Sequence, residues 1–245
     1  MINIIQGLFM WKLFFDIAYA FSFLIISPSA RFRFRDWTLF GYREKLDDLL
    51  NTRPELRNKK LRVTKGGGSL AFIFDECDVY RVRKRRYEAT TVFPRLAREQ
   101  RITNALRRYC TVQIPDIEII HGKKFIFYKT SFIPGVILAN LSRKTLNAHS
   151  DEIAAQLATF LKKLHSAKPK SIADLTDGDK NKHWCHTDLC SNILIDPKTF
   201  VITGVIDWEW ATWANIDIDF TSLYNRRRKM RRTEIPTKTI NKYYE

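Results

Sequence analysis

The second quarter of the chain alternates apolar and polar residues in short runs. Leu61–Thr64, Leu70–Phe74 and Val79–Val82 are separated by a glycine-rich turn and by a charged turn. Short runs joined by such turns predict three consecutive antiparallel strands. Two more strands are predicted at Ile117–Ile120 and Lys124–Tyr128. The N-terminal half is therefore expected to consist mainly of β-structure.

Apolar residues at helical spacing mark two longer segments. Within Glu88–Tyr109 they share one face, and Pro94 favours a helix that begins at that residue. A second apolar stripe runs along Ser150–Leu164, with Ser150 expected as the N-cap. The charged stretch Arg43–Lys60 is expected to be helical and then to loop. The whole pattern predicts an α+β protein with a β-rich lobe, a helical lobe and a ligand-binding crevice between them.

Polar residues cluster at one place in the second half. A loop with His186, Asp188 and Asn192 precedes a tight hairpin of apolar strands, and the return strand ends at Asp207. The hairpin is expected to bring Asp188, Asn192 and Asp207 together. Phosphoryl transfer needs such a set, because one carboxylate orients the attacking hydroxyl while hard oxygen ligands hold magnesium against the phosphates. Asp188 suits the hydroxyl, and Asn192 and Asp207 suit the metal.

The order of these residues resembles a known family. His-x-Asp, Asn-Ile-Leu and Val-Ile-Asp-Trp-Glu, over residues 186–209, are similar to the catalytic loop and metal-binding segment of the aminoglycoside phosphotransferase family, which includes choline kinase-like members. Asn215–Phe220 and the helix Gln156–His165 are similar to flanking segments of that family. The resemblance covers residues 61–224 and implies a two-lobed, protein-kinase-like fold.

The resemblance also implies a role for individual residues. Asp188 would be the catalytic base and His186 its structural support, while Asn192 and Asp207 would ligate Mg²⁺. The implied ATP contacts are the turn Gly66, Gly67, Gly68 and Ser69 at the phosphates, Arg81 with its helix partner Glu99, and the backbone of Ser131, Phe132 and Ile133 at the adenine. The position of Glu99 on an apolar helical stripe independently predicts a nearby cation, because a buried carboxylate needs one. Arg81 is the expected donor, with Arg83 and Lys84 as alternatives. The other interpretation is that Glu99 borders the stripe and reaches water.

Three features depart from the family pattern. Asn192 follows Asp188 by four residues, where kinases have a spacing of five. Arg81 stands where lysine is usual, which is compatible with phosphate binding because arginine is a good phosphate ligand. Only a short stretch with the basic run Arg226–Arg232 follows Phe220. These departures leave open a truncated acceptor site, an open cleft for a large substrate, or a catalytically impaired pseudokinase that acts as a binding module.

Composition narrows the class of protein further. A hydrophobic fraction of 45% excludes global disorder, and a net charge of +16 predicts a surface that attracts anions. Nucleic acid is disfavoured as a partner, because few aromatic residues accompany the basic tail. The four cysteines are too sparse for a disulfide framework. Cys185 and Cys190 lie near two histidines but lack a C-x-x-C pair, which argues against zinc.

The first 27 residues are unusually apolar, with the uncharged run Ile17–Ile26. Three interpretations stay open: a membrane-spanning or interfacial anchor, a helix packed on the protein itself, and a cleaved signal peptide. The predicted location is cytoplasmic, with membrane association through this segment. The predicted divisions are an extension over residues 1–57, a nucleotide-binding lobe over 58–133 and a catalytic lobe over 134–245.

The function predicted from the sequence is transfer of the γ-phosphate of Mg·ATP to a hydroxyl of a small molecule or glycolipid. The expected cofactors are ATP and Mg²⁺, and the expected partners are a small-molecule hydroxyl acceptor and an anionic membrane surface. The alternatives are the pseudokinase and a basic membrane-associated protein. Nothing in the sequence identifies the acceptor, because fold and motif fix only the phosphate-donor side.

Overall fold

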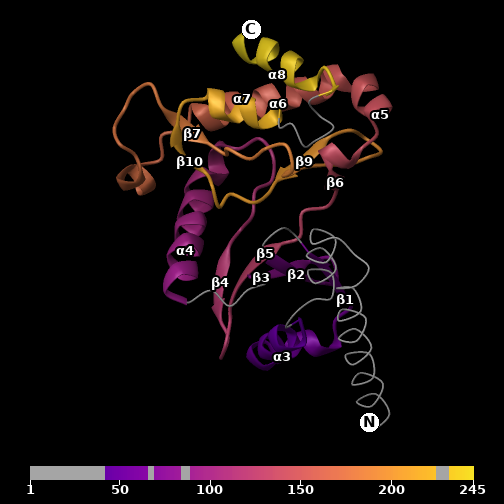
Figure 1. Cartoon of the computed structure of the whole chain (residues 1–245), viewed down its shortest axis with the longest axis vertical. Helices are drawn as coiled ribbons and strands as arrows, with labels where there is room; N and C mark the ends of the chain where they lie inside the picture. The colour runs from indigo at the N-terminus through magenta and orange to yellow at the C-terminus, as the bar shows by residue number, and fades with distance from the viewer. Residues whose placement is uncertain (1–41, 66–68, 84–88, 225–231) are drawn as a thin grey trace, which may run out of the picture.

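Five antiparallel strands form the sheet of the N-terminal lobe, in the order β1-β2-β3-β5-β4 (Figure 1). The structure is a computed structural model that describes residues 42–65, 69–83, 89–224 and 232–245. The strands are β1 Leu61–Lys65, β2 Ser69–Phe74, β3 Asp78–Arg83, β4 Glu118–His121 and β5 Ile126–Ser131. The predicted run of three consecutive antiparallel strands is confirmed, with Leu61 opposite Phe74 and Ala71 opposite Arg81.

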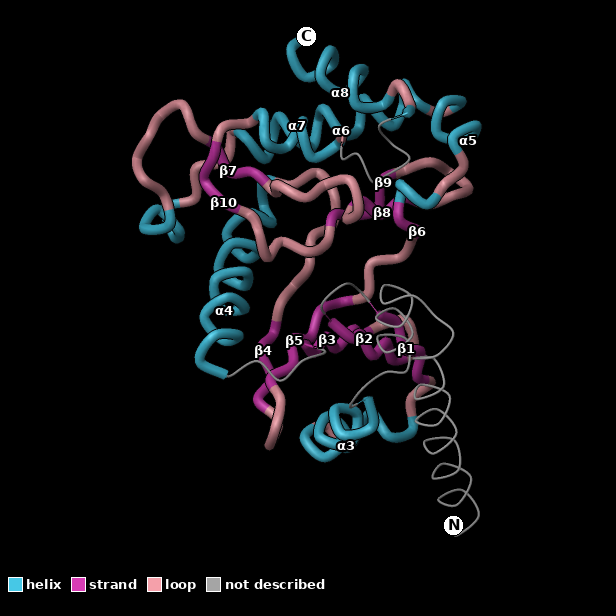
Figure 2. The backbone as a smooth tube through the Cα atoms, in the orientation of Figure 1, coloured by secondary structure: helices cyan, strands magenta, loops and turns pink. Residues whose placement is uncertain are grey.

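The two faces of this sheet have different partners. Helix α3, Tyr42–Thr52, covers the face away from the C-terminal lobe (Figure 2). Its Leu49 is buried in one cluster with Phe72, Phe74 and Phe127 of the strands. The other face, which carries Arg81 and Tyr128, is turned toward the C-terminal lobe. The sequence assigned α3 to an N-terminal extension, and the divisions at residues 57 and 133 stay predictions.

A buried carboxylate on α3 holds the turn between β4 and β5. Asp48 accepts hydrogen bonds from the backbone amides of Lys123, Lys124 and Phe125, at 2.9, 3.0 and 2.9 Å. Gly122 precedes this turn, and a Cβ there would lie 2.4 Å from Asp48 Oδ2. Residues 123–125 are therefore part of a turn, and β5 begins at Ile126 rather than at the predicted Lys124.

Replacing Asp48 by alanine is expected to lower the free energy of unfolding by about 3 kcal/mol, because buried amides lose a charged acceptor. Urea denaturation measures the change. The matched control is Asp47→Ala, since Asp47 is the exposed neighbour on the same helix. Equal stabilities for the two variants would contradict this account of the turn.

Helix α4, Ala89–Leu106, runs from the N-terminal lobe to the C-terminal lobe (Figure 1). The predicted start at Pro94 is wrong, because the helix begins at Ala89 and Pro94 lies inside it. A proline there removes one backbone hydrogen bond near the start of the helix, which the remaining turns tolerate. The predicted stripe is confirmed by the burial of Leu96, Ile102 and Leu106.

The C-terminal lobe combines short strands with helices. Strands β6 Val136–Ile137, β8 Ile193–Ile195 and β9 Ile202–Val205 form one sheet, and β7 His183–Cys185 pairs with β10 Thr212–Ala214. The α-helices are α5 Arg143–Ala148, α6 Ser150–His165, α7 Asp217–Leu223 and α8 Ile235–Tyr244. Short 3-10 turns lie at Pro54–Asn58, Arg107–Tyr109, Leu138–Asn140 and Lys170–Leu175. The predicted α+β architecture of two lobes is confirmed.

Helix α6 forms the centre of this lobe. Leu157, Phe160 and Leu161 are fully buried, and α8 packs along the helix. Ser150 is not the predicted N-cap, because the carbonyl of His149 already accepts the first helical hydrogen bond from the Ile153 amide. The Ser150 hydroxyl instead accepts a hydrogen bond from the Lys238 ammonium of α8 at 2.9 Å.

The predicted membrane association is corrected. In the part of the chain that the structure describes, no helix combines the length and the apolar character needed to cross a bilayer. The apolar run that prompted the prediction, Ile17–Ile26, lies outside the described residues.

Candidate active site

The loop between β7 and β8 carries Asp188 and closes tightly. The Asn192 amide donates to the carbonyl of Leu189 at 2.8 Å. The Asn192 side-chain nitrogen donates to the Asp188 carbonyl at 2.7 Å and to Asp188 Oδ2 at 3.1 Å. The loop is one residue shorter than the family pattern, yet its two polar side chains are in direct contact.

The β8–β9 hairpin places Asp207 beside this loop. The amide of Ile206, which precedes Asp207, donates to the carbonyl of Asn192 at 2.9 Å. Asp207 has a left-handed backbone with φ of +66°, a conformation that costs energy for a residue other than glycine and is frequent at functional sites. The structure therefore brings together Asp188, Asn192 and Asp207, as the hairpin pattern predicts.

His186 ties the loop to the hairpin from the inside. Its Nδ1 accepts a hydrogen bond from the Asp188 amide at 3.3 Å, so its Nε2 donates to the carbonyl of Ile206 at 3.0 Å. Burial lowers the pKa of His186, in keeping with this neutral tautomer. The ring is fully buried against Trp208. This geometry suits the structural role that the resemblance implies for His186.

Asp219, a buried residue in the first turn of α7, holds the backbone of the same loop. Its carboxylate accepts from the amide of His186 at 3.1 Å and from the amide of Thr187 at 2.6 Å. Thr187 has φ of +72°, so Asp219 stabilises a strained turn directly before Asp188. No role was predicted for Asp219 from the sequence, although the similarity of Asn215–Phe220 to a family segment was a signal.

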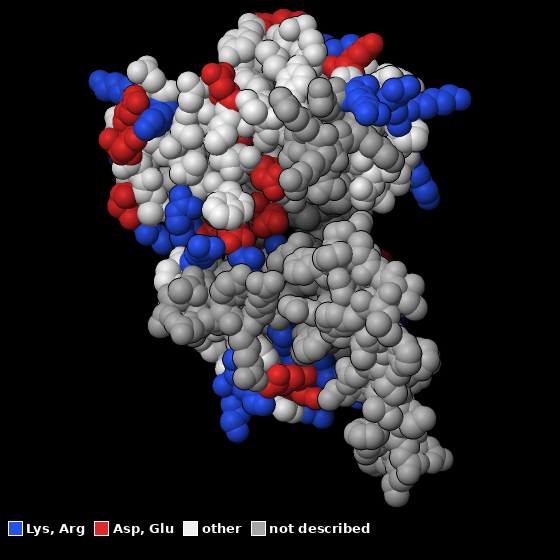
Figure 3. All heavy atoms as spheres, viewed as in Figure 1, with Lys and Arg blue, Asp and Glu red and all other residues white. Residues whose placement is uncertain are grey.

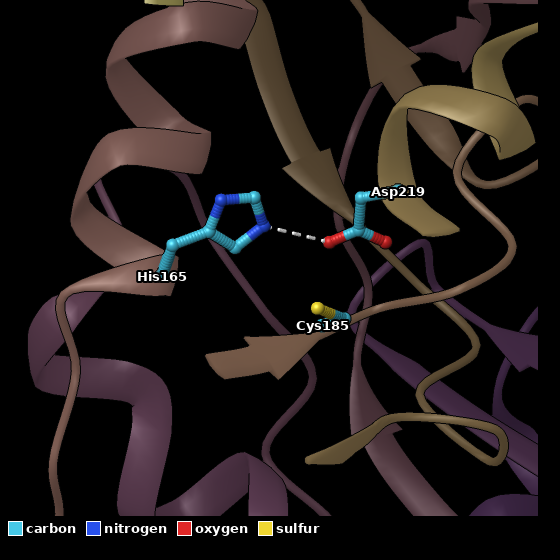
Figure 4. A group of neighbouring side chains, drawn as sticks. All are labelled: His165, Cys185 and Asp219. Atoms are coloured by element: carbon cyan, nitrogen blue, oxygen red, sulfur yellow. Dashed lines mark hydrogen bonds and ion pairs between the residues drawn. The ribbon is translucent and has the colours of Figure 1, made fainter. Parts of the chain in front are cut away.

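A histidine at the end of α6 supports Asp219 in turn. His165 Nε2 donates to Asp219 Oδ2 at 3.1 Å (Figure 4). Its Nδ1 lies 2.9 Å from the Tyr243 hydroxyl of α8. His165 and Asp219 are both buried. A chain of hydrogen bonds thus connects α8, α6 and α7 to the loop that carries Asp188.

Cys185 lies beside this pair, so that ligand atoms of His165, Cys185 and Asp219 fall within 4.8 Å of one another. The spacing would suit a metal, but the hydrogen bonds already engage His165 and Asp219. The Cys185 thiol lies 3.7 Å from the carbonyl of Ala214, and burial raises its pKa, which keeps it protonated. The cluster is best explained as hydrogen-bonded packing.

Arg81 and Glu99 reach the site from the N-terminal lobe, but they do not pair as predicted. Arg81 lies over the Tyr128 ring and its guanidinium is 3.4 Å from Asp207 Oδ1. Glu99, 2% exposed, accepts a hydrogen bond from the Trp208 amide at 3.2 Å. Among the described residues no ion pair joins Arg81 to Glu99. Both side chains instead hold the segment that begins at Asp207.

Burial raises the pKa of Glu99 to about 7, against the opposing effect of Arg81. The carboxylates of Asp207 and Glu209 raise it further. The folded protein therefore favours protonated Glu99 at pH values where the unfolded chain has already released the proton. Stability from this group is complete below about pH 4.5 and is lost as the pH rises toward about 7.

The Glu99→Gln variant has no carboxyl to titrate at position 99, so we expect it to lack this pH-dependent loss of stability. In metal-free protein, the thermal midpoint of the wild type should fall relative to that of Glu99→Gln as the pH rises through this window. Thermal denaturation over a pH series in a chelator measures the difference, with exposed Glu55→Gln as the control. A constant difference between wild type and Glu99→Gln across the window would argue against a buried titrating carboxyl.

The remaining predicted nucleotide contacts are described only in part. Gly66, Gly67 and Gly68 lie outside the described residues. Ser69 opens β2 opposite Arg83, and Ser131 ends β5 opposite Asp78.

In the connection after β5, the backbone amide of Phe132 is hydrogen-bonded and that of Ile133 is not, among the described residues. The Phe132 amide donates to the carbonyl of Cys77 at 2.8 Å, whereas none of the described residues accepts from the Ile133 amide. Ile133 packs on Gly204 of β9, where a Cβ would lie 2.7 Å from Ile133 Cγ2 and from the Gln113 carbonyl. Only glycine fits this close approach of three segments.

Comparison with known proteins agrees with this geometry. The phosphotransferase enzyme family matches residues 171–245, which include the Asp188 loop, the hairpin and Asp219. None of the curated proteins matches the sequence.

Several solved structures share the fold. The GDP complex of an aminoglycoside 2′-phosphotransferase-IIIa is 15% identical, with a TM-score of 0.67 and 82% of each chain covered. The streptomycin–ATP–APH(2″)-IIa ternary complex is 19% identical, with a TM-score of 0.61. The match covers 81% of this chain and 84% of that one. The macrolide 2′-phosphotransferase MphH from Brachybacterium faecium is 17% identical, with a TM-score of 0.58. The match covers 81% of this chain and 82% of that one.

These findings show that the chain has a protein-kinase-like fold and that residues 171–245 match the phosphotransferase enzyme family. The resemblance to the aminoglycoside phosphotransferase family is confirmed by sequence over residues 171–245 and by fold over about four-fifths of the chain.

Proposed function

We propose that this chain transfers the γ-phosphoryl group of Mg·ATP to a hydroxyl group of a small molecule or glycolipid. The observation that carries the proposal is the contact between Asp188 and Asn192, at 2.7 and 3.1 Å, beside Asp207. Asp207 follows Ile206, whose backbone amide donates to the carbonyl of Asn192 at 2.9 Å. The solved complexes of similar enzymes contain ADP, ATP or GDP, and some contain an aminoglycoside.

Asp188 is the group that accepts the proton of the attacking hydroxyl. Asn192 donates to its Oδ2, and the Ser191 hydroxyl lies 3.4 Å from its Oδ1. These contacts fix the plane of the carboxylate, and the side chain is only half-buried, so an acceptor hydroxyl can reach it. A positioned general base contributes a factor of about 10² to 10⁴ to the rate.

Asn192 and Asp207 have the donor atoms that Mg²⁺ prefers. The nitrogen of the Asn192 amide faces Asp188, which leaves its oxygen directed away from that contact. The Asp207 carboxylate is about one-third exposed and contacts the guanidinium of Arg81. Bound there, Mg²⁺ would neutralise charge on the phosphates. Arg81, on the opposite lobe, is placed to contact a phosphate oxygen once it leaves Asp207.

The connection after β5 suits the base of the nucleotide. The amide of Ile133 has no acceptor among the described residues, and the Ile133 side chain packs on Gly204. A base that bonds to backbone groups at this edge would keep its phosphates on the side of Arg81 and Asp207.

An acceptor screen tests the proposal. The purified protein is incubated with Mg·ATP and each of a set of amino sugars, neutral sugars, choline-like alcohols and glycolipids. Mass spectrometry detects the gain of one phosphate, and a coupled assay follows ADP. Phosphorylated product that requires Mg²⁺ supports the proposal. Absence of both acceptor-dependent ADP and any phosphorylated product would overturn it.

A further inference from the structure

The side of the site next to α4 carries more positive than negative charge among the described residues. Arg83 of β3 and Arg95 and Arg98 of α4 all lie against residues 209–211, where Glu209 is the acidic residue. Figure 3 shows basic side chains at the waist between the lobes, next to a group of acidic ones.

The three arginines differ in how closely each guanidinium is paired with another group of the protein. Arg83 forms an ion pair with Glu209, whose side chain is only 11% exposed. Arg98 donates to the carbonyl of Ala211 at 2.8 Å. Arg95 is 64% exposed, and its guanidinium is 3.9 Å from Glu209, beyond hydrogen-bond distance. Because Arg83 already neutralises Glu209, the charge of Arg95 is the one that a ligand can use.

Trp210 lies beside Arg95 and is 62% exposed. The Arg95 guanidinium is 6.0 Å from the centre of its ring. The carbonyl of Trp210 accepts a hydrogen bond from the Thr187 hydroxyl at 3.1 Å, and Thr187 directly precedes Asp188. An exposed indole is therefore fixed, through its backbone, to the loop that carries the proton acceptor.

We propose that the acceptor is a ring compound with an anionic group, a sugar phosphate or sugar acid, whose ring stacks on Trp210 and whose anion pairs with Arg95. This inference rests on the proposed function. An indole face provides a large, rigid apolar surface, and a guanidinium binds phosphate or carboxylate through two parallel hydrogen bonds. A polycationic acceptor would meet the positive charge of Arg95, which Glu209 does not neutralise.

Matched ring compounds test this charge preference. Thermal midpoints are measured in Mg·ADP, which prevents turnover, with glucose, glucose 6-phosphate, glucuronate or glucosamine added at millimolar concentration. The two anionic compounds are expected to stabilise the protein more than glucose does, and glucosamine less. A larger shift with glucose 6-phosphate than with glucuronate assigns the site to phosphate, and the reverse order assigns it to carboxylate.

Variants separate the contribution of each residue. Arg95→Gln is expected to weaken the binding of the preferred anionic sugar about tenfold and to abolish the preference over glucose. Trp210→Ala should weaken the binding of all four sugars. Arg101→Gln is the matched control on α4, because Arg101 pairs with Asp174 instead. The shift caused by Mg·ADP alone should be the same in all three variants.

The outcomes distinguish this inference from the proposed function. If Mg·ADP does not stabilise the wild type, the proposed function fails and the inference fails with it. If Mg·ADP does stabilise the wild type, the inference is overturned when neither anionic sugar adds stability, when glucosamine equals them, or when Arg95→Gln keeps the preference.

Discussion

Asp188→Asn is expected to lower kcat by about a thousandfold, within the range that a positioned general base contributes. Asparagine keeps the size of the side chain but cannot accept the proton of the attacking hydroxyl. The Asn192 amide can still donate to the side-chain oxygen that the variant keeps at position 188, so the loop should retain its shape. Steady-state kinetics with the best acceptor from the screen measures the loss.

The nucleotide should bind to Asp188→Asn almost as tightly as to the wild type, because the metal ligands Asn192 and Asp207 are unchanged. Asp196→Asn is the control, since Asp196 lies on the same hairpin and only caps its exposed turn. Full turnover by Asp188→Asn would remove the assignment of the base.

Asp219→Asn is expected to lower the free energy of unfolding by about 3 kcal/mol, because one buried charged acceptor serves three donors. Those donors are the amides of His186 and Thr187 and the ring of His165. The amide side chain would direct at least one N–H toward a donor. Urea denaturation measures the loss of stability, and kcat well below the unfolding transition measures the effect on the loop.

The loss of kcat distinguishes positioning from simple destabilisation. Asp219→Asn should lower kcat about a hundredfold with a smaller change in KM, because it displaces Asp188 rather than the nucleotide. Asp217→Asn is the control on the same helix, where Asp217 is exposed. Tyr243→Phe removes only the outermost hydrogen bond and should have a smaller effect. Normal kcat in folded Asp219→Asn would exclude the positioning role.

Regular patterns made much of the fold predictable from the sequence. Alternation fixed the three consecutive strands from Leu61 onward, and helical periodicity identified α6 and most of α4. The convergence of Asp188, Asn192 and Asp207 was predictable because a tight apolar hairpin leaves few geometries for its flanking turns. These features depend on residues close in sequence, where local physics determines the result.

Features that depend on distant contacts were missed. Proline often stands at the start of a helix, but α4 begins five residues before Pro94, at Ala89. Arg81 and Glu99 were predicted to contact each other. Arg81 instead forms an ion pair with Asp207, and Glu99 accepts a hydrogen bond from the Trp208 amide. Asp48 bonds to residues about 75 positions away. No local pattern reports such a partner.

The buried support of the catalytic loop illustrates the same limit. His165 ends a helix that the apolar stripe predicted, and a histidine there looks like an ordinary helix terminus. Its importance follows from meeting Asp219, which lies 54 positions away in sequence. Only the fold brings these two residues under the loop that carries Asp188.

The measurement that tests the central claim most directly is the thermal midpoint with and without Mg·ATP, for the wild type and for Asp207→Asn. A ligand that binds only the native state stabilises it by about 2.7 kcal/mol at a hundredfold excess over its Kd. The site predicts a magnesium-dependent rise in the wild type that Asp207→Asn loses. No rise in the wild type at millimolar Mg·ATP, or an equal rise in the variant, would contradict a metal–nucleotide site at Asn192 and Asp207.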